Sequence, residues 1–222
     1  MEKAETGVGL IQRHFPSMSP NQTRQWEALE GLYRDWNSRI NLISRKDLDG
    51  LYEKHVLHSL SIAAAFDLKA GMQILDLGTG GGFPGIPLAI FFPKVRFHLI
   101  DGIGKKIAAV RAIGHSLGLD NLSAEQIRAE EIRGRRFDCV VSRAVAPLRE
   151  LWDWSLPLLR TRPLTAPCGL ICLKGGDLSE ELVSCSVQPR LIPINQLFEE
   201  AYFREKYVVY ASRQSRSKAQ PA

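Results

Sequence analysis

The chain has 222 residues, of which 45% are hydrophobic and 24% charged, and this suits one globular α/β domain with a full core. It contains no run of 18 apolar residues and no apolar segment behind a basic N-terminus, so we predict neither a membrane span nor a secretory signal. The four cysteines form no C-x-x-C pair, which argues against a structural zinc site and is typical of buried thiols in the cytosol. The net charge of +5 permits a polyanionic partner such as RNA without requiring one.

The N-terminal region predicts one long amphipathic helix. Residues 1–18 show little pattern, and we expect them to be flexible. Ser19 can then serve as an N-cap, with Pro20 at the first helical position and Gln22 completing a capping box. Apolar and aromatic residues between positions 26 and 36 recur at helical spacing, and we expect that face to be core.

A second helical pattern covers residues 47–66 and contains two histidines. The i, i+3 spacing of His55 and His58 could ligate a metal, but no acidic or cysteine partner stands nearby. Surface or turn-bonding histidines are therefore the better interpretation, and we predict no metal site. Residues 19–68 together are expected to form a helical cap that precedes the α/β domain.

The most informative stretch is residues 73–85, Q-I-L-D-L-G-T-G-G-G-F-P-G. An apolar run that stops at a glycine cluster is typical of a buried parallel strand that ends in a tight turn. Glycine permits positive φ and lets a ligand lie against the backbone. Residues 86–92 can then begin a helix. A strand, a glycine turn and a helix N-terminus in this order predict a cofactor-binding corner.

The second strand, residues 95–100, ends at an acid. At that position Asp101 could accept hydrogen bonds from two ribose hydroxyls of a bound nucleoside. It could equally cap the helix that begins near Gly104. The two interpretations are compatible.

The α/β alternation continues to residue 211, so residues 69–211 are predicted to form the main domain and 212–222 a mobile basic tail. Arg143 stands just beyond a central strand, at the sheet edge where ligands bind; a structural ion pair is nearly as common there. The expected elements are a helix at 105–117, a weak strand at 123–127, a strand at 137–141, a helix at 148–159 distorted near Pro157, a strand at 169–173, a short helix at 177–183, and antiparallel strands at 187–194 and 206–211.

Two glycine patterns overlap in the turn. Residues 76–82, D-x-G-x-G-x-G, fit a loop that passes an adenosyl amino acid, whereas residues 80–85 satisfy the dinucleotide fingerprint G-x-G-x-x-G. Pro84 has no N–H to offer a pyrophosphate, and Phe83 would crowd the place where one would lie. The spacing therefore favours S-adenosylmethionine, and an NAD-linked oxidoreductase stays as an alternative.

Five stretches between residues 32 and 210 make the chain resemble the RsmG (GidB) family of bacterial 16S ribosomal RNA guanine-N7 methyltransferases. The combination of the glycine turn, F-P-G-I-P directly after it and S-R-A-V-A about 60 residues later is specific to that family. The stretches are W-N-x-x-I-N-L at 36–42, H-x-x-x-S-L at 55–60, residues 76–87, S-R-A-V-A at 142–146 and L-K-G at 173–175.

The resemblance implies a class I, Rossmann-like methyltransferase with a seven-stranded, mostly parallel sheet and an N-terminal helical extension. Arg143 would face the reaction centre and orient the substrate. Donor-contact candidates, from the resemblance and the glycine pattern, are Asp76, Gly78, Gly80, Gly82, Phe83, Asp101, Gly102, Ile103, Ala129, Glu130 and Arg143. The basic residues that we expect near RNA phosphates are Lys105, Lys106, Arg133, Arg135, Arg136 and Lys174.

The implied reaction is methylation of guanine N7 in the 530 loop of 16S rRNA, position 527 in the usual rRNA numbering, with S-adenosylhomocysteine as product. The expected partner is the small ribosomal subunit or its rRNA, and the expected state is a cytoplasmic monomer. The family usually has Asp where His58 stands, which puts any role of that carboxylate in doubt here. A non-catalytic adenosyl-ligand or RNA-binding assembly factor is the alternative from another functional class.

Overall fold

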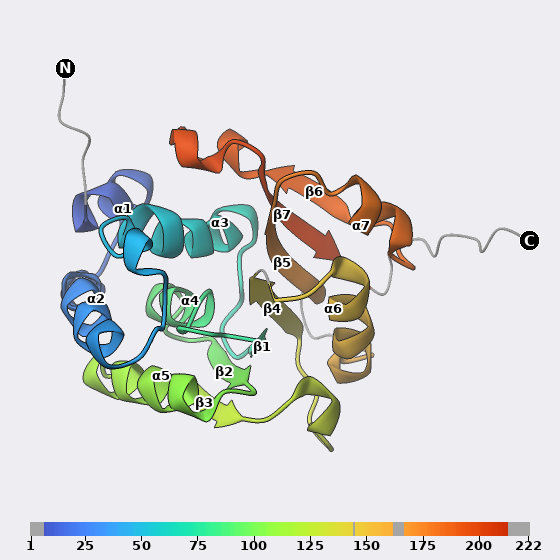
Figure 1. Ribbon diagram of the computed structural model, residues 1–222, viewed down its shortest axis with the longest axis horizontal. Helices are drawn as coiled ribbons and strands as arrows, with labels where there is room; N and C mark the ends of the chain where they lie inside the picture. The colour runs from blue at the N-terminus through green and yellow to red at the C-terminus, as the bar shows by residue number, and fades with distance from the viewer. Residues whose placement is uncertain (1–6, 144, 162–166, 213–222) are drawn as a thin grey trace, which may run out of the picture.

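The computed structural model describes residues 7–143, 145–161 and 167–212. Seven strands form one sheet in the order β3-β2-β1-β4-β5-β7-β6, with helices on both faces (Figure 1). β7 runs antiparallel to both β5 and β6, and the other neighbouring pairs are parallel. The strands are β1 (Gln73–Leu77), β2 (Arg96–Asp101), β3 (Leu122–Gln126), β4 (Cys139–Arg143), β5 (Gly169–Gly175), β6 (Arg190–Pro193) and β7 (Lys206–Ala211).

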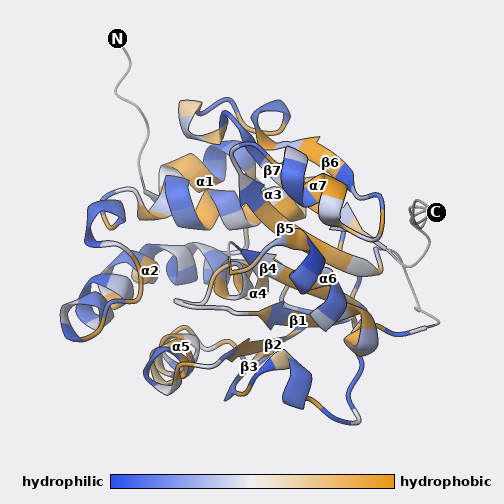
Figure 2. Cartoon of the chain, turned by 45° about the vertical axis from the view of Figure 1, so that its right-hand side comes forward, coloured by the Kyte–Doolittle hydropathy of each residue, from blue (hydrophilic) through white to orange (hydrophobic). Residues whose placement is uncertain are grey.

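The sheet divides the core into two layers because successive strand residues point to opposite faces. In β1, Ile74 packs into the layer that contains the N-terminal helices, α4 and α5, and Leu75 packs into the layer under α6. Figure 2 shows hydrophobic colour along the central strand β5 and hydrophilic colour on the outward turns of α6. The α-helices are α1 (Val8–His14), α2 (Pro20–Arg39), α3 (His58–Ala65), α4 (Gly85–Phe91), α5 (Gly104–Ser116), α6 (Leu148–Ser155) and α7 (Ser179–Ser184).

The predicted N-terminal cap is present, and it is larger than expected. The capping box at Ser19 and Gln22 forms as predicted. The expectation that residues 1–18 are flexible is wrong for α1, because Leu10 and Ile11 are buried in the core. Hydrophobic burial stabilises a helix that is too short to persist by itself. Residues 1–6 lie outside the described residues, as does the predicted tail after Ser212.

The predicted helix at 47–66 is not continuous. It divides into a 3-10 turn (Arg45–Asp47), a π-helical turn (Leu51–Leu57) and α3. Such π-turns are rare and often occur at functional sites. Both His55 and His58 are buried, contrary to the expectation of surface histidines.

The central strand β4 begins two residues later than predicted. Phe137 forms only an isolated bridge with Leu159, and its amide donates to Leu158 O at 2.8 Å. β4 also ends two residues later than predicted, so Arg143 is its last residue and does not lie beyond it. The distortion near Pro157 is confirmed, since α6 ends at Ser155 and a 3-10 turn (Leu156–Leu158) follows. Among the described residues, no helix is both long and apolar enough to cross a membrane.

Candidate functional site

The glycine turn after β1 brings the backbone close to its neighbours. Gly78 has φ of 69°, and a Cβ there would lie 2.7 Å from Val145 Cγ1. Gly82 has φ of 93°, and a Cβ there would lie 2.4 Å from Ile86 Cδ1. Both positions combine a left-handed backbone with a close side-chain neighbour, so each strongly favours glycine.

Asp76 supports the turn from the interior of the protein, where its side chain is fully buried. Its Oδ2 accepts hydrogen bonds from Thr79 Oγ1 at 2.6 Å and from Gly85 N at 2.9 Å. The side chain is fully buried, and Oδ1 has no hydrogen-bond partner among the described residues. Burial raises the pKa of Asp76 to about 7. The structure thus places Asp76 as a support of the turn.

Asp101 joins the turn to the start of α5. Its Oδ2 accepts from Gly80 N at 2.9 Å and its Oδ1 accepts from Ile103 N at 2.8 Å. Each carboxylate oxygen can accept a further hydrogen bond, because an oxygen has two lone-pair sites. Asp101 therefore orders the loop at the base of α5 and keeps acceptor capacity for a ligand.

A cavity of about 320 Å³ opens beside Asp101 at the carboxyl edge of the sheet. Six of the predicted donor contacts line it, which are Gly78, Asp101, Gly102, Ile103, Ala129 and Glu130. Sequence reasoning missed the other six lining residues, which are Leu77, Ile100, Ile127, Arg128, Val145 and Trp154. Val145 could have been found, because it lies in the S-R-A-V-A stretch; Trp154 carries no such signal.

The residues of this cavity fit an adenosyl ligand. Gly102 has nothing within 4 Å of an added Cβ, so the floor beside Asp101 is open. The lining combines one carboxylate at the tip of β2 with apolar side chains from Ile100, Ile103 and Trp154. A mostly apolar pocket with few polar groups is typical of a small-molecule site.

Phe83 does not line the cavity, and its ring points into the protein. It is buried, stacks on Tyr33 with ring centroids 4.9 Å apart, and lies 5.0 Å from the His55 ring. Tyr33 Oη donates to Gly81 O at 2.7 Å, which ties α2 to the turn. The expectation that Phe83 would crowd a pyrophosphate is therefore wrong, because its side chain packs under the helical cap.

The backbone gives a better reason to reject a dinucleotide. The amide of Gly80 donates to Asp101, and the amides of Gly82 and Phe83 donate to Thr79 O at 2.9 and 3.0 Å. The amide of Gly85 donates to Asp76. A pyrophosphate at such a turn needs free backbone N–H groups, and these four are already used within the protein.

Arg143 lies on the other side of the turn, among the residues of the helical cap. Its guanidinium carbon stands 4.9 Å from the centroid of the Phe83 ring. Nη2 lies 2.9 Å from His55 Nδ1, and Nη1 donates to Lys54 O at 3.4 Å. Burial lowers the pKa of the guanidinium. The predicted site residues are thus divided among the cavity, the glycine turn and this cluster; β1, which ends in the glycine turn, lies between β2, which ends at Asp101, and β4, which ends at Arg143.

Four of the predicted RNA contacts are exposed, and Lys106 is partly buried. Lys105 and Lys106 stand in the first turn of α5, next to the cavity. Arg135 already pairs with Glu125 at 3.1 Å, and Arg133 and Arg136 bond to nearby backbone carbonyls.

Lys174 does not fit its predicted role. It is buried, and its Nζ donates to Ala146 O at 2.5 Å and pairs with Glu181 Oε2 at 2.8 Å. We therefore no longer place it at an RNA surface. It fixes the segment that follows Arg143.

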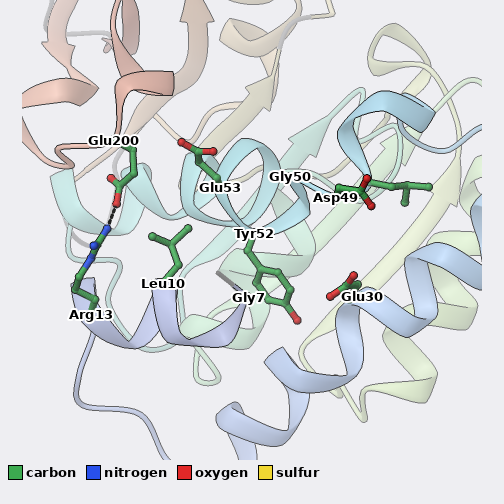
Figure 3. Close-up of a pocket in the computed structure, with 10 residues that line it drawn as sticks. Gly7, Leu10, Arg13, Glu30, Asp49, Gly50, Tyr52, Glu53 and Glu200 are labelled. Carbon is green, nitrogen blue, oxygen red and sulfur yellow. Dashed lines mark hydrogen bonds and ion pairs between the residues drawn. The ribbon is translucent and has the colours of Figure 1, made fainter. Parts of the chain in front are cut away.

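A second cavity, of about 370 Å³, lies within the helical cap (Figure 3). It shares no lining residue with the cavity beside Asp101. Figure 3 shows Arg13 pointing toward Glu200, with which it forms an ion pair. In the part of the chain that the structure describes, no group of three or more His, Cys, Asp or Glu side chains could hold a metal ion.

Known proteins with similar structures share this architecture. A SAM-dependent methyltransferase from Aquifex aeolicus superposes with a TM-score of 0.52, at 17% identity, over 76% of this chain and 97% of that one. An MtNAS mutant in complex with S-adenosylmethionine superposes with a TM-score of 0.53, at 13% identity, over 85% of this chain and 75% of that one. At these identities the similarity concerns the fold, which is the class I, Rossmann-like fold.

Sequence comparison is more specific. The protein named ribosomal RNA small subunit methyltransferase G in Phocaeicola vulgatus is 50% identical over 91% of this chain and 97% of its own length. The protein of the same name in Porphyromonas gingivalis is 50% identical over 92% of this chain and 93% of its own length. The relative of that name in Bacteroides fragilis is 47% identical over 94% of this chain and 93% of its own. Residues 22–196 match the family GidB, described as rRNA small subunit methyltransferase G. The chain belongs to this family.

Proposed function

We propose that the protein transfers a methyl group from S-adenosylmethionine to N7 of a guanine in the 530 loop of 16S rRNA. The observation that carries the proposal is the cavity at the carboxyl edge of the sheet, with Asp101 at the tip of β2 and the turn at Gly78 beside it. The family's description as an rRNA small subunit methyltransferase supports the substrate class. The choice of guanine N7 rests on the resemblance given above.

The donor would lie along the cavity with its ribose at Asp101. The two carboxylate oxygens would accept from the ribose hydroxyls while keeping their bonds to the amides of Gly80 and Ile103. Ala129 and Glu130 would lie by the adenine. When bound, S-adenosylmethionine supplies an electrophilic methyl group on a sulfonium.

The acceptor needs no proton removed, because guanine N7 already carries a free lone pair. The protein's task is then alignment of the two reacting groups and stabilisation of the charge that forms on the base. Arg143 would orient the base by donating to guanine O6, which is an acceptor next to N7. The described residues that line the cavity include no Ser, Cys or His, as expected for a reaction that needs no nucleophile–base pair.

The RNA would contact the exposed basic residues Lys105, Arg133, Arg135 and Arg136, together with Lys106, which is partly buried. N7 lies in the deep, narrow major groove of A-form RNA, so the target base must stand in a loop or be splayed out. Phosphate contacts release counterions, and RNA affinity should therefore fall steeply as salt rises from 50 to 200 mM. An affinity that does not respond to salt would exclude these residues from the interface.

Label transfer from tritiated S-adenosylmethionine to rRNA that lacks the modification tests the proposal. Transfer to the 530-loop guanine supports it. Binding of S-adenosylhomocysteine without transfer to either naked 16S rRNA or the small subunit would favour the assembly-factor alternative. Binding of NADH in place of S-adenosylhomocysteine would favour an oxidoreductase.

A further inference from the structure

Arg143 and His55 form a bond that fixes the protonation of the histidine. The distance from Arg143 Nη2 to His55 Nδ1 is 2.9 Å. A guanidinium can only donate hydrogen bonds, so His55 Nδ1 must be the acceptor and cannot carry a proton. The ring is then neutral, and its one N–H is on Nε2.

The environment of His55 supports the neutral form. The residue is 9% exposed, and burial together with the charge of Arg143 lowers its pKa to about 3. Its Nε2 is buried and has no hydrogen-bond partner among the described residues. The ring thus keeps its acceptor at Nδ1 for Arg143 at neutral pH.

Arg143 has N–H donors that form no hydrogen bond within the described residues. Within the described residues it forms no ion pair, and its second bond, to Lys54 O, is long at 3.4 Å. A guanidinium has five N–H groups, and its flat face is already covered by Phe83 at 4.9 Å. Arg143 is half-buried, and a partly desolvated cation without an anionic partner is costly; such groups are retained at sites that bind a ligand.

We propose that His55 is a positioning residue for the acceptor base, which it serves by holding the plane of the Arg143 guanidinium. Its Nδ1 accepts one N–H while Phe83 packs against the face, so the remaining donors have one fixed direction. A guanidinium held in this way can donate to guanine O6 without first losing rotational freedom. This inference rests on the proposed function.

His58 provides a matched control. It follows His55 by one turn, is 7% exposed, and also has a buried Nε2 without a partner among the described residues. Its ring contacts Tyr202 and Phe203, each with centroids 6.0 Å away, and in the described structure no hydrogen bond joins it to Arg143. A general effect of losing a buried histidine should therefore appear equally at both positions.

The first test measures the tautomer directly and does not depend on activity. In the full chain labelled with 15N-histidine, we expect His55 at pH 7 to show the neutral ring with the proton on Nε2. Arg143→Met should return the ring toward a mixture of tautomers. A proton on Nδ1, or a charged ring, in the unsubstituted protein would overturn the inference while leaving the proposed function intact.

The second test is a double-mutant cycle in the methylation assay. We expect His55→Leu to lower kcat at least tenfold with S-adenosylhomocysteine affinity within twofold, and His58→Leu to lower kcat less than threefold. His55→Asn, whose Oδ1 can replace Nδ1 as acceptor, should recover most of the loss even if His55→Leu folds poorly. In the Arg143→Met background, His55→Leu should cost nothing further. An additive loss, or equal losses at His55 and His58, would overturn the inference.

Discussion

Gly78→Ala tests where the donor lies. The substituted residue would keep φ near 69°, which costs an L-residue roughly 1–2 kcal/mol. Its Cβ would also lie 2.7 Å from Val145 Cγ1, a distance at which one of the two must move. Val145 is 43% exposed and can shift, but it lines the cavity, so its movement changes the space for the ligand.

We therefore expect two separate effects. The free energy of unfolding, measured in urea, should fall by about 1–2 kcal/mol. This is the cost of the left-handed backbone for alanine, and the clash adds little because Val145 can move toward solvent. The affinity for S-adenosylhomocysteine, measured by calorimetry, should fall at least tenfold, which corresponds to about 1.4 kcal/mol.

Two glycines separate these effects. Gly118 has φ of 64° and nothing within 4 Å of an added Cβ, and it follows the far end of α5. Gly118→Ala should lose stability but bind the ligand normally. Gly102 lines the cavity, has no positive φ, and has no atom within 4 Å of an added Cβ. Gly102→Ala should therefore change the free energy of unfolding little. If Gly78→Ala binds S-adenosylhomocysteine as tightly as Gly118→Ala does, the donor does not lie against Gly78.

Three further substitutions test the supports of the site. Asp101→Ala should weaken S-adenosylhomocysteine binding by about 1–3 kcal/mol in calorimetry, and unchanged binding would remove Asp101 from the donor site. Asp76 has a pKa of about 7 in the folded state against about 3.9 unfolded, so its contribution to stability is lost as pH rises from 4 to 7. Asp76→Asn should remove that slope, at most about 1.4 kcal/mol per pH unit, from urea unfolding between pH 4 and 7; an unchanged slope would show that Asp76 does not titrate there. Lys174→Met should weaken S-adenosylhomocysteine binding, because it frees Ala146 O and Glu181 next to the Val145 segment, and a loss of RNA affinity alone would contradict this positioning role.

The sequence predicts correctly those features of the site that are formed by a few consecutive residues. The apolar run at 74–77 and the glycines directly after it are adjacent in sequence, and Asp101 is recognised from its own strand, which it ends; the structure joins the two segments through the bond from Gly80 N to Asp101, 21 residues away. The capping box at Ser19 is also local. Each of these signals, the strand followed by glycines, the acid that ends the second strand and the capping box, occupies a few consecutive residues, which the sequence displays directly.

Features that depend on distant segments were predicted less well. Lys174 has the composition of a surface contact, but its environment is made by Ala146 and Glu181, and only the tertiary fold shows that it is buried. The inward direction of Phe83 depends on Tyr33 in α2. In the same way α1 is stabilised by packing, since Leu10 and Ile11 are buried and α1 contacts α2 and the π-helical turn at Leu51–Leu57.

The division of the predicted site is the main consequence of the structure for function. Asp101 lines the donor cavity, whereas Arg143 lies with His55 beneath the helical cap. Sequence alone placed both at one sheet edge, because parallel strands end there together. It could not show that the glycine turn stands between them, with the donor proposed on one side and the base-orienting group on the other.

Mapping the methylated nucleotide tests the central claim most directly. The protein would be incubated with tritiated S-adenosylmethionine and either naked 16S rRNA or the small subunit, both from cells that lack the modification. We predict that the label appears at N7 of a 530-loop guanine in at least one substrate. Label at another atom or nucleotide, or no transfer to either substrate by protein that binds S-adenosylhomocysteine, would contradict the account.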